Sequence, residues 1–468
     1  MLDFKPISEE HIPLLRKYYS QCTYGLCEYS LGVKLMWREH WRPEFAQSHG
    51  CLVVLNHSPR HGTMFDFPVP LPEEGDVDAA LDDVDAWCVE QAAAPSFGVV
   101  PEYERERLMR RYPYTTVDSD RVWQDYFYHA EALSAFAGRH YAGQRNHINK
   151  FRKLYPEAVY RELTAADRGG VEEFWRAFHR DFHKEDAEAK LEVCYARRLV
   201  MEQMGAEWAL TGCVELEGKI IAVALAEVCG ETLVCHIEKA LPQYEGVYPF
   251  LVQSFAQAHS GGLRWINRED DAGDRGLRTS KLQYLPAFLG AKVRLLARNE
   301  LSSLGSIPVL RTERLLLDSL REEDRAAYNR LCLDDERNRW WGYDYRDDLE
   351  GELTEDYFLE VAREDFRNRQ AVNFAVRLDG VFIGEAVLYR FDYKGGAELG
   401  CRILPEYAGH GYGTEAYCRV AEWALYTLGL YRLVGKCCHE NEASKRMLES
   451  CMRPNGQDET FLYFEKKV

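Results

Sequence analysis

The sequence lacks any run of about 18 consecutive apolar residues, the length that a membrane-spanning helix needs. Its start, Met1-Leu2-Asp3-Phe4-Lys5, lacks the basic segment and the apolar core of a secretory signal peptide. CxxC spacings and Cys/His clusters are absent as well, so the 14 cysteines are expected to be reduced and mostly buried, and no metal site is predicted. A cytoplasmic protein without a membrane span is the resulting expectation.

An excess of basic charge is also missing. The formal net charge of −18 is spread over both halves of the chain and opposes general attraction to phosphate backbones. Aminoacyl-tRNA is therefore a disfavoured partner, because it would need a local basic groove. The densest basic cluster belongs to Gln124–Phe151, whose pattern predicts a long helix broken at Gly138 and Gly143. These basic residues fit such a groove and fit a solvated helix face equally well.

The clearest ligand signal is the segment Gly409–Ala416, which reads GHGYGTEA. It follows the alternating apolar segment Leu399–Leu404 and leads into a helical pattern that Gly429 closes. Glycines at alternate positions let a backbone approach a ligand closely, and the free N–H groups of a helix start suit a pyrophosphate. Taken alone, such a loop is more often only a turn, so its surroundings have to decide.

Those surroundings predict three consecutive antiparallel strands, then a strand and a short helix after the loop. The predicted elements are strands Asn373–Arg377, Val381–Phe391, Glu398–Leu404 and Tyr431–Cys437, and a helix from Asn441 to Cys451. With these elements, 308–468 resembles the GNAT acyl-CoA acetyltransferase superfamily. It looks most like the ribosomal-protein alanine N-acetyltransferases, which also begin with a phrase like Leu310–Leu317.

The resemblance implies acetyl-CoA as cofactor. It assigns the CoA pyrophosphate to the backbone of Gly409, His410, Gly411, Tyr412, Gly413 and Thr414, and the pantetheine to the edge at Ile403 and Leu404. Two positions depart from the family: Ala408 stands where Arg or Gln is usual, and Leu448 where many members carry Tyr. The tail after Met452 is also short for the last hairpin, which predicts a trimmed end or one completed by another segment.

Amine acetylation needs a base, because a protonated amine with a pKa near 10 must lose a proton before it attacks a thioester. Glu398 is the candidate, and the alternative is a strand-end glutamate paired with Arg402 or Arg390. Asn441 is a candidate for orienting pantetheine or a water, and it equally fits a helix N-cap. Ser444 is the candidate donor to the leaving thiolate.

The region 157–293 repeats the order of strands and helices found near the C-terminus, without the glycine loop. Lys239–Tyr248 contains one glycine where the other region has three, so a CoA cradle is not expected there. The phrases Asp125–Tyr128, Gly143–Phe151, His236–Ala240 and Ile266–Gly273 make about 20–298 resemble the C-terminal synthase domain of phosphatidylglycerol lysyltransferases. This resemblance implies two fused GNAT-like lobes that accept aminoacyl-tRNA in characterised members. Those proteins carry a membrane-spanning half that this sequence lacks, so a lipid acceptor is not expected.

Polar residues at predicted strand ends of this region form a second candidate site, and an ion-pair network that fastens two lobes is the alternative. The candidates are Glu238, Lys239, Asn267, Arg268, Glu269, Arg278 and Lys281, with Tyr126, Tyr128 and Arg145 on the opposite wall.

The predicted fold class is α+β, with three GNAT-like lobes whose mixed central sheets are flanked by helices. The predicted division is 1–156, 157–298, a linker at 299–307, and 308–468. We predict an acyltransferase that moves acetyl from acetyl-CoA to a small-molecule or peptide amine, with the N-terminal pair as a second transferase or substrate module. The rivals are an aminoacyl-tRNA-dependent transferase and a non-catalytic acyl-CoA sensor.

Overall fold

The computed structural model describes the whole chain except residues 1, 59–61, 181–186, 342–345, 347–348 and 350. The chain divides into two compact units. The first consists of Met1–Val84, Ser96–Arg105 and Val117–Leu295, and the second of Asp85–Pro95, Glu106–Thr116 and Leu296–Val468. No helix in the described ranges is both long and apolar enough to cross a membrane.

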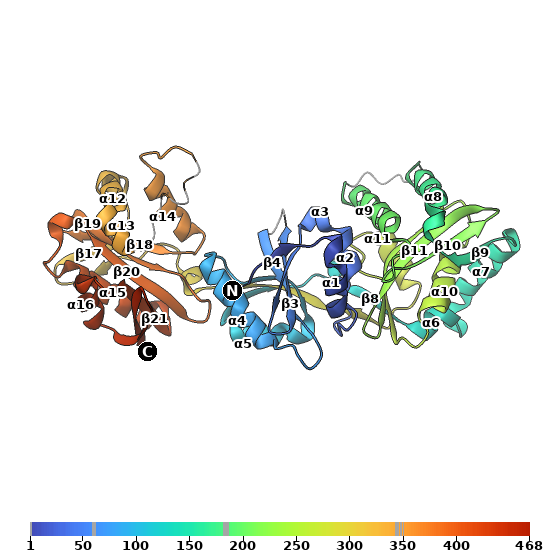
Figure 1. The fold of residues 1–468 in the computed structure, drawn as a ribbon, viewed down its shortest axis with the longest axis horizontal. Coiled ribbons are helices and arrows are strands. Elements are labelled where there is room, and N and C mark those ends of the chain that lie inside the picture. Colours follow the sequence, from blue (N-terminus) through green and yellow to red (C-terminus); the bar gives the residue numbers. More distant parts are fainter. Residues whose placement is uncertain (1, 59–61, 181–186, 342–345, 347–348, 350) are drawn as a thin grey trace. The chain divides into compact units, whose positions relative to one another are not determined.

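Three mixed sheets flanked by helices make up the fold, as the sequence predicts (Figure 1). The first sheet has the strand order β1-β2-β3-β4-β6-β15-β7, with β5 pairing with β3. Its strands are β1 (Lys5–Pro6), β2 (Glu44–Ser48), β3 (Cys51–Ser58), β4 (Gly62–Asp66), β5 (Val69–Pro70), β6 (Ser96–Pro101), β7 (Tyr114–Asp118) and β15 (Lys292–Arg298). Its helices are α1 (Ile12–Tyr19), α2 (Leu31–Met36), α3 (Arg38–Trp41), α4 (Val77–Glu90) and α5 (Arg105–Arg111).

The second sheet has the order β14-β8-β13-β12-β11-β10-β9. Its strands are β8 (Asp125–His129), β9 (Val159–Glu162), β10 (Leu210–Leu216), β11 (Lys219–Cys229), β12 (Thr232–Ala240), β13 (Trp265–Asn267) and β14 (Phe288–Gly290). The accompanying helices are α6 (Ala130–Ala135), α7 (Ala142–Leu154), α8 (Arg168–Arg180), α9 (Ala187–Gln203), α10 (Val247–His259) and α11 (Arg275–Leu282).

The third sheet lies in the second unit and has the order β16-β17-β18-β19-β20-β21-β23-β22. Its strands are β16 (Leu310–Arg311), β17 (Leu315–Ser319), β18 (Val372–Leu378), β19 (Val381–Tyr389), β20 (Gly396–Ile403), β21 (Arg432–Cys438), β22 (Arg453–Gln457) and β23 (Phe461–Lys467). The helices α12 (Arg325–Cys332), α13 (Asp335–Trp341) and α14 (Tyr357–Arg367) cover one face, and α15 (Tyr412–Trp423) and α16 (Glu442–Glu449) cover the other (Figure 1).

Each sheet contains a short parallel pair of the same kind: β4 with β6, β12 with β13, and β20 with β21. In each case the two strands are joined through a helix: α4, α10 and α15 respectively. The pairing covers only two or three residues on each strand, so the strands separate soon after they meet. This repeated strand-helix-strand unit is what the resemblance to GNAT-like lobes predicts.

Two predictions about local structure are wrong. Gln124–Phe151 does not begin as a helix: Asp125–His129 is β8, because its three consecutive aromatic residues favour a strand buried between β13 and β14. The C-terminal end is not trimmed or borrowed from elsewhere, because β22 and β23 form the last hairpin and β23 pairs with β21. Within the predicted linker 299–307, a 3-10 turn over Glu300–Ser303 buries Glu300 and Leu301.

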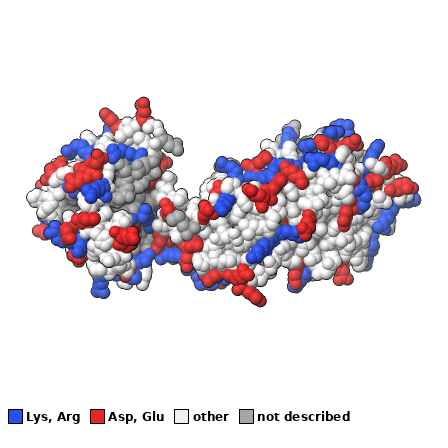
Figure 2. Space-filling view, in the orientation of Figure 1, with Lys and Arg blue, Asp and Glu red and all other residues white. Residues whose placement is uncertain are grey.

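Basic and acidic side chains intermingle over the visible surface (Figure 2). The predicted basic cluster on α7 fits the solvated-face interpretation in part, because Lys150 pairs with Glu245 at 2.6 Å and both are about half exposed. Arg145 instead turns inward and donates to the carbonyls of Phe136 and Gly138.

Candidate functional site

The first feature of the candidate site is an open strand edge in the third sheet. β20 pairs with β19 up to Gly384↔Ile403, but with β21 only at Gly396, Ala397 and Glu398. The other edge of β21 pairs with β23 along its whole length, from Arg432 to Cys438, so β21 stays in the sheet while it parts from β20 after Glu398. The β21-facing side of β20 from Leu399 to Ile403 therefore has no strand partner within the described residues, although the Tyr417 hydroxyl donates to the Leu399 carbonyl at 3.1 Å.

The predicted edge at Ile403 and Leu404 is only partly at this opening. Ile403 is half-buried and its side chain lies 3.4 Å from where a Cβ on Gly413 would be. Leu404 is 2% exposed, packs in the core, and donates its N–H to the Ile383 carbonyl at 2.8 Å. Ile403 is thus the available residue of the two.

Two glycines on the strands at this opening, Gly400 and Gly435, allow aromatic side chains to pack directly against the sheet. A Cβ on Gly400 would lie 2.6 Å from the Trp341 ring of α13, and one on Gly435 would lie 2.4 Å from the Tyr417 hydroxyl of α15. Any larger residue at either position would push these aromatic side chains away from the sheet.

The glycine loop stands at the start of α15 and is exposed. Gly409 and Gly411 have φ angles of +82° and +79°, a conformation that residues with a side chain rarely adopt. A Cβ on Gly409 would have no heavy atom within 4 Å, and one on Gly411 would meet only Arg314, at 3.6 Å. No described side chain caps the helix, so the N–H groups of its first turn remain available to a ligand.

Glu398 lies on the face that carries Gly400 and has three polar neighbours. The Tyr389 hydroxyl donates to its carboxylate at 2.6 Å. Lys436 pairs with it at 3.3 Å and Arg390 at 3.6 Å, and the side chain is 11% exposed. The pairing with Arg390 that the sequence offered as an alternative is present, while Arg402 is not its partner.

Arg402 pairs instead with Glu385, at 2.6 Å. Glu385 is fully buried and also accepts from Tyr328 at 3.1 Å and from Asn373 at 3.2 Å. A carboxylate that is satisfied on all sides in a closed core has no route to an incoming amine. Glu385 is therefore a structural residue of the third sheet.

The other two predicted catalytic residues lie at the start of α16. The Asn441 side chain accepts from the Ser444 N–H at 3.0 Å, so the helix-cap interpretation of Asn441 holds. Leu448 is 1% exposed on the same helix and packs inward, which fits an apolar residue where many family members carry Tyr.

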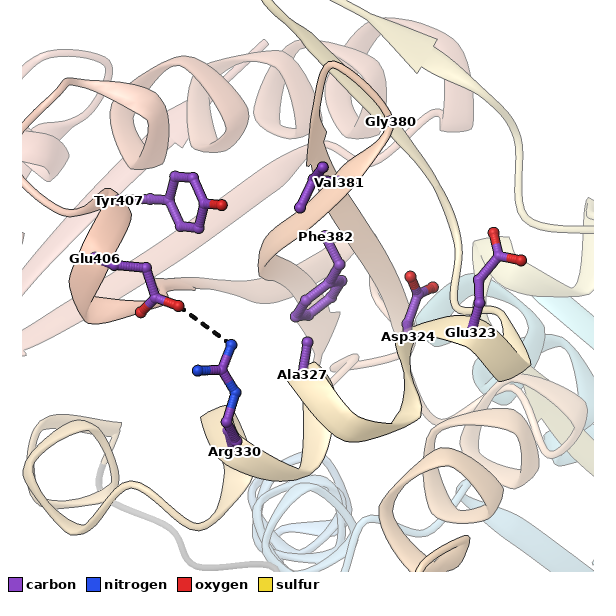
Figure 3. Close-up of a pocket in the computed structure, with 9 residues that line it drawn as sticks. All are labelled: Glu323, Asp324, Ala327, Arg330, Gly380, Val381, Phe382, Glu406 and Tyr407. Carbon is purple, nitrogen blue, oxygen red and sulfur yellow. Dashed lines mark hydrogen bonds and ion pairs between the residues drawn. The ribbon is translucent and has the colours of Figure 1, made fainter.

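A cavity of about 260 Å³ lies beside the residues that precede the glycine loop (Figure 3). Arg330 of α12 reaches across it to Glu406, with their side chains 3.2 Å apart, and Phe382 and Tyr407 form apolar walls. Glu323 and Asp324 add negative charge at the rim. None of the predicted site residues lines this cavity.

In the first unit, the residue that corresponds to Gly411 is covered. Gly246 precedes α10 with φ +86° and ψ 3°, close to the 79° and 2° of Gly411. A Cβ on Gly246 would lie 2.4 Å from the His147 carbonyl oxygen and 3.1 Å from Phe151. Helix α7 therefore occupies the space that a pyrophosphate would need, which agrees with the lost glycines in the sequence.

The candidate residues of the first unit separate into pairs with different partners. Arg268 pairs with Glu238 at 2.7 Å and stacks on the Tyr284 ring at 4.4 Å, yet one of its terminal nitrogens, Nη1, is buried and has no partner among the residues that the structure describes. Lys281 donates to the carbonyls of Arg268 and Asp270. Burial lowers the pKa of the Lys281 ammonium below its usual value.

Two predicted residues belong to clusters whose other members the sequence did not reveal. Glu269 bonds to His236 at 2.9 Å, and His236 bonds to Glu227 at 3.0 Å on its other side. Burial lowers the pKa of His236, but the bonds to the two carboxylates outweigh it and raise the pKa to about 9. Arg278 pairs with the fully buried Asp271 at 2.7 Å.

Tyr126 joins the same cluster by donating to Asp271 at 2.6 Å, and Arg121 pairs with that carboxylate at 2.7 Å. The Tyr128 hydroxyl donates to the Lys281 carbonyl at 2.8 Å. Both tyrosines are fully buried. Arg145 bonds elsewhere, as described above, so the predicted opposite wall of the cleft does not exist as one surface.

Asn267 donates to Asp125 at 2.7 Å. Asp125 belongs to a group of three side chains whose ligand atoms lie close enough together to hold a metal ion. Cys27, Glu28 and Asp125 converge, but the Lys292 ammonium lies 2.5 Å from Glu28 and 2.8 Å from Asp125. The lysine thus takes the position of a cation. Lys239 pairs separately with Glu192 at 2.8 Å.

Two family models match the chain. The model described as phosphatidylglycerol lysyltransferase, C-terminal, matches residues 22–292, and the acetyltransferase (GNAT) domain model matches residues 314–451. Together they confirm the fusion that the sequence resemblance suggests.

Individual relatives are distant. An uncharacterized N-acetyltransferase, YoaA, of Bacillus subtilis is 25% identical over 144 residues, which is 30% of this chain and 80% of that protein. A conserved protein of unknown function from Bacteroides thetaiotaomicron has a similar structure, with TM-score 0.56 and 24% identity over 63% of this chain and 99% of its own. Mycobacterium smegmatis RimJ, solved in complex with CoA-disulfide, has TM-score 0.29 and 18% identity over 35% of this chain and 87% of its own.

Proposed function

Because this chain belongs to the family of the phosphatidylglycerol lysyltransferase C-terminal domain and also contains a GNAT acetyltransferase domain, we propose that its second unit transfers acetyl from acetyl-CoA to a primary amine of a small molecule or peptide. The observation that carries the proposal is the open glycine loop beside the β20 edge, which loses its neighbour after Glu398. Loop N–H groups suit a pyrophosphate, and an open strand edge suits an extended chain of amides.

The residues present fit CoA. Backbone N–H groups of Gly409–Thr414 would hold the pyrophosphate, since the space beside Gly409 and Gly411 is empty of other backbone. The edge from Leu399 to Ile403 would hold pantetheine. When bound, acetyl-CoA supplies an activated thioester carbonyl for attack by the amine.

Glu398 is proposed to take the proton from the ammonium form of the acceptor, directly or through a water. The Tyr389 hydroxyl orients the carboxylate, and Lys436 and Arg390 pair with it. The amine nitrogen then forms the new bond to the carbonyl carbon as the bond to sulfur breaks. Ser444 is proposed to give a proton to the leaving thiolate and to regain one, through water, from the nitrogen that has formed the new bond, with Asn441 holding the start of α16 in place.

The test is release of free thiol from acetyl-CoA in the presence of a mixed library of primary amines, with mass spectrometry of the products. We expect thiol release that depends on an amine and yields one acetylated product class. Tight CoA binding without thiol release under any amine would favour the acyl-CoA sensor, the alternative suggested by Ala408 and Leu448.

For the first unit we propose a second transferase or a substrate-selecting module. The buried cluster around Arg268, Glu238 and Lys281 supports a polar ligand, because one guanidinium nitrogen lacks a partner in the described part of the chain. The alternative is an aminoacyl-tRNA-dependent transferase. Product formation that requires charged tRNA and continues without acetyl-CoA would favour that alternative.

A further inference from the structure

The turn between β16 and β17 places a guanidinium on the glycine loop. Arg314 is 44% exposed, and its Nη2 lies 3.6 Å from where a Cβ on Gly411 would be. Its Nη1 donates to the His410 carbonyl at 3.1 Å, and its guanidinium carbon lies 4.6 Å from the centre of the Tyr412 ring. The side chain therefore touches three consecutive residues of the loop, His410 to Tyr412.

The position of Arg314 is fixed by a carboxylate on α15. Glu415 accepts from Arg314 Nε at 2.7 Å, from the Arg314 backbone N–H at 3.1 Å, and from the Thr312 hydroxyl at 2.5 Å. Burial alone would raise the pKa of Glu415, but the bonds from Thr312 and Arg314 outweigh it and lower the pKa. Glu415 is thus a charged anchor that holds the arginine beside the first turn of the helix.

The arginine retains donors for a ligand. A guanidinium has five N–H groups, and the contacts to Glu415 and His410 engage one each on Nε, Nη2 and Nη1. Among the described residues, one N–H on each terminal nitrogen is left over. Charged N–H donors held in the plane of a rigid guanidinium suit the oxygens of a phosphate.

We propose that Arg314 binds the phosphates of CoA and takes over the role of the Arg or Gln that is missing at Ala408. This inference rests on the proposed function. Ala408 is exposed and carries no donor, and no residue of Gly409–Thr414 is a lysine or an arginine, so the loop itself brings no permanent positive charge to the phosphates. Arg314 adds a positive charge at the same place from a different segment of the chain. The role of the Leu310–Leu317 phrase is then to bring this charge to the loop.

The experiment measures the affinity of the full-length protein for CoA by calorimetry at several salt concentrations, and compares Arg314→Gln with Arg311→Gln. Arg311 is an exposed arginine three residues away, so it is a matched control for the loss of one charge. We expect Arg314→Gln to weaken CoA binding about tenfold or more, since a charge-assisted hydrogen bond is lost, and to reduce the salt dependence of binding. Arg311→Gln should change neither.

A second donor separates phosphate binding from a structural role. Transfer from S-acetyl-pantetheine, which has no phosphates, should be as fast in Arg314→Gln as in the unaltered protein. Equal losses with both donors, or no loss with either, would overturn the inference while leaving the proposed function intact. Arg314→Lys keeps the positive charge opposite Glu415 but lacks the planar set of N–H donors. If Arg314→Gln does not fold, weaker CoA binding by Arg314→Lys would support the inference, and unchanged binding would overturn it. Absence of CoA binding in the unaltered protein would overturn the proposed function and this inference with it.

Discussion

Replacing Gly411 by valine should abolish CoA binding. The backbone there has φ +79°, and a residue with a Cβ in this left-handed conformation costs about 1–2 kcal/mol. The new Cβ would lie 3.6 Å from Arg314 Nη2, and the two methyl groups beyond it would extend into the space assigned to the pyrophosphate. The strain should lower the melting temperature by about 2–8 °C, and calorimetry should detect no CoA binding.

Gly429 provides the control. It ends the π-helical turn Ala424–Leu428 that continues α15, has φ +96°, and would meet no heavy atom within 4 Å if it carried a Cβ. Gly429→Val therefore introduces similar backbone strain away from the loop. It should lose a similar amount of stability and keep the CoA affinity of the unaltered protein. Unchanged CoA affinity in Gly411→Val, or equal losses in both variants, would refute the assignment of the loop.

Three further predictions concern other residues. Glu398→Gln should lower acetyl transfer about 10²–10⁴-fold with CoA affinity nearly intact, and a higher pH should recover part of the rate by deprotonating the amine; full rate at neutral pH would place the base elsewhere. Calorimetry should find one CoA per chain, because α7 covers Gly246, and a second site of similar affinity that survives Gly411→Val would contradict this. The His236 pKa of about 9 lies above the ordinary 6.5, so its stabilisation of up to about 3 kcal/mol is complete below pH 6.5 and is lost as the pH rises through 9. Urea unfolding of His236→Gln should lack this decline, and an identical decline in both proteins would assign it to other groups.

The local pattern of the sequence was enough for the part of the second unit from β18 to α16, but not for helices α12 to α14 or the last hairpin. Alternating residues and turn glycines predict β18, β19 and β20 to within a few residues, and the glycine loop before α15 follows from its spelling. The α+β class with three mixed sheets is confirmed for the same reason. The structure shows the contacts of the predicted site residues, but their roles in binding and catalysis remain predictions.

Contacts between distant segments could not be predicted. Nothing near Glu398 in the sequence indicates that Lys436 comes from the next strand, or that Arg314 reaches Glu415 on α15. His236 and Asp271 were missed because each gains its partners only when separate strands and helices meet. A signal was available for both, because His236 lies in the phrase His236–Ala240 and Asp271 in the phrase Ile266–Gly273, which carry the family resemblance, but neither is among the predicted site residues.

The strand order of the first sheet has a consequence for biosynthesis. β15 lies between β6 and β7, although β7 ends at residue 118 and β15 only at residue 298. At about 5–20 residues per second, a ribosome needs roughly 10–40 s to make the intervening chain. During that interval β7 lacks its neighbour and β6 presents an unpaired edge, the kind of strand that mispairs with other chains. The nascent N-terminal segment therefore keeps an unpaired strand edge until residue 298 has left the ribosome.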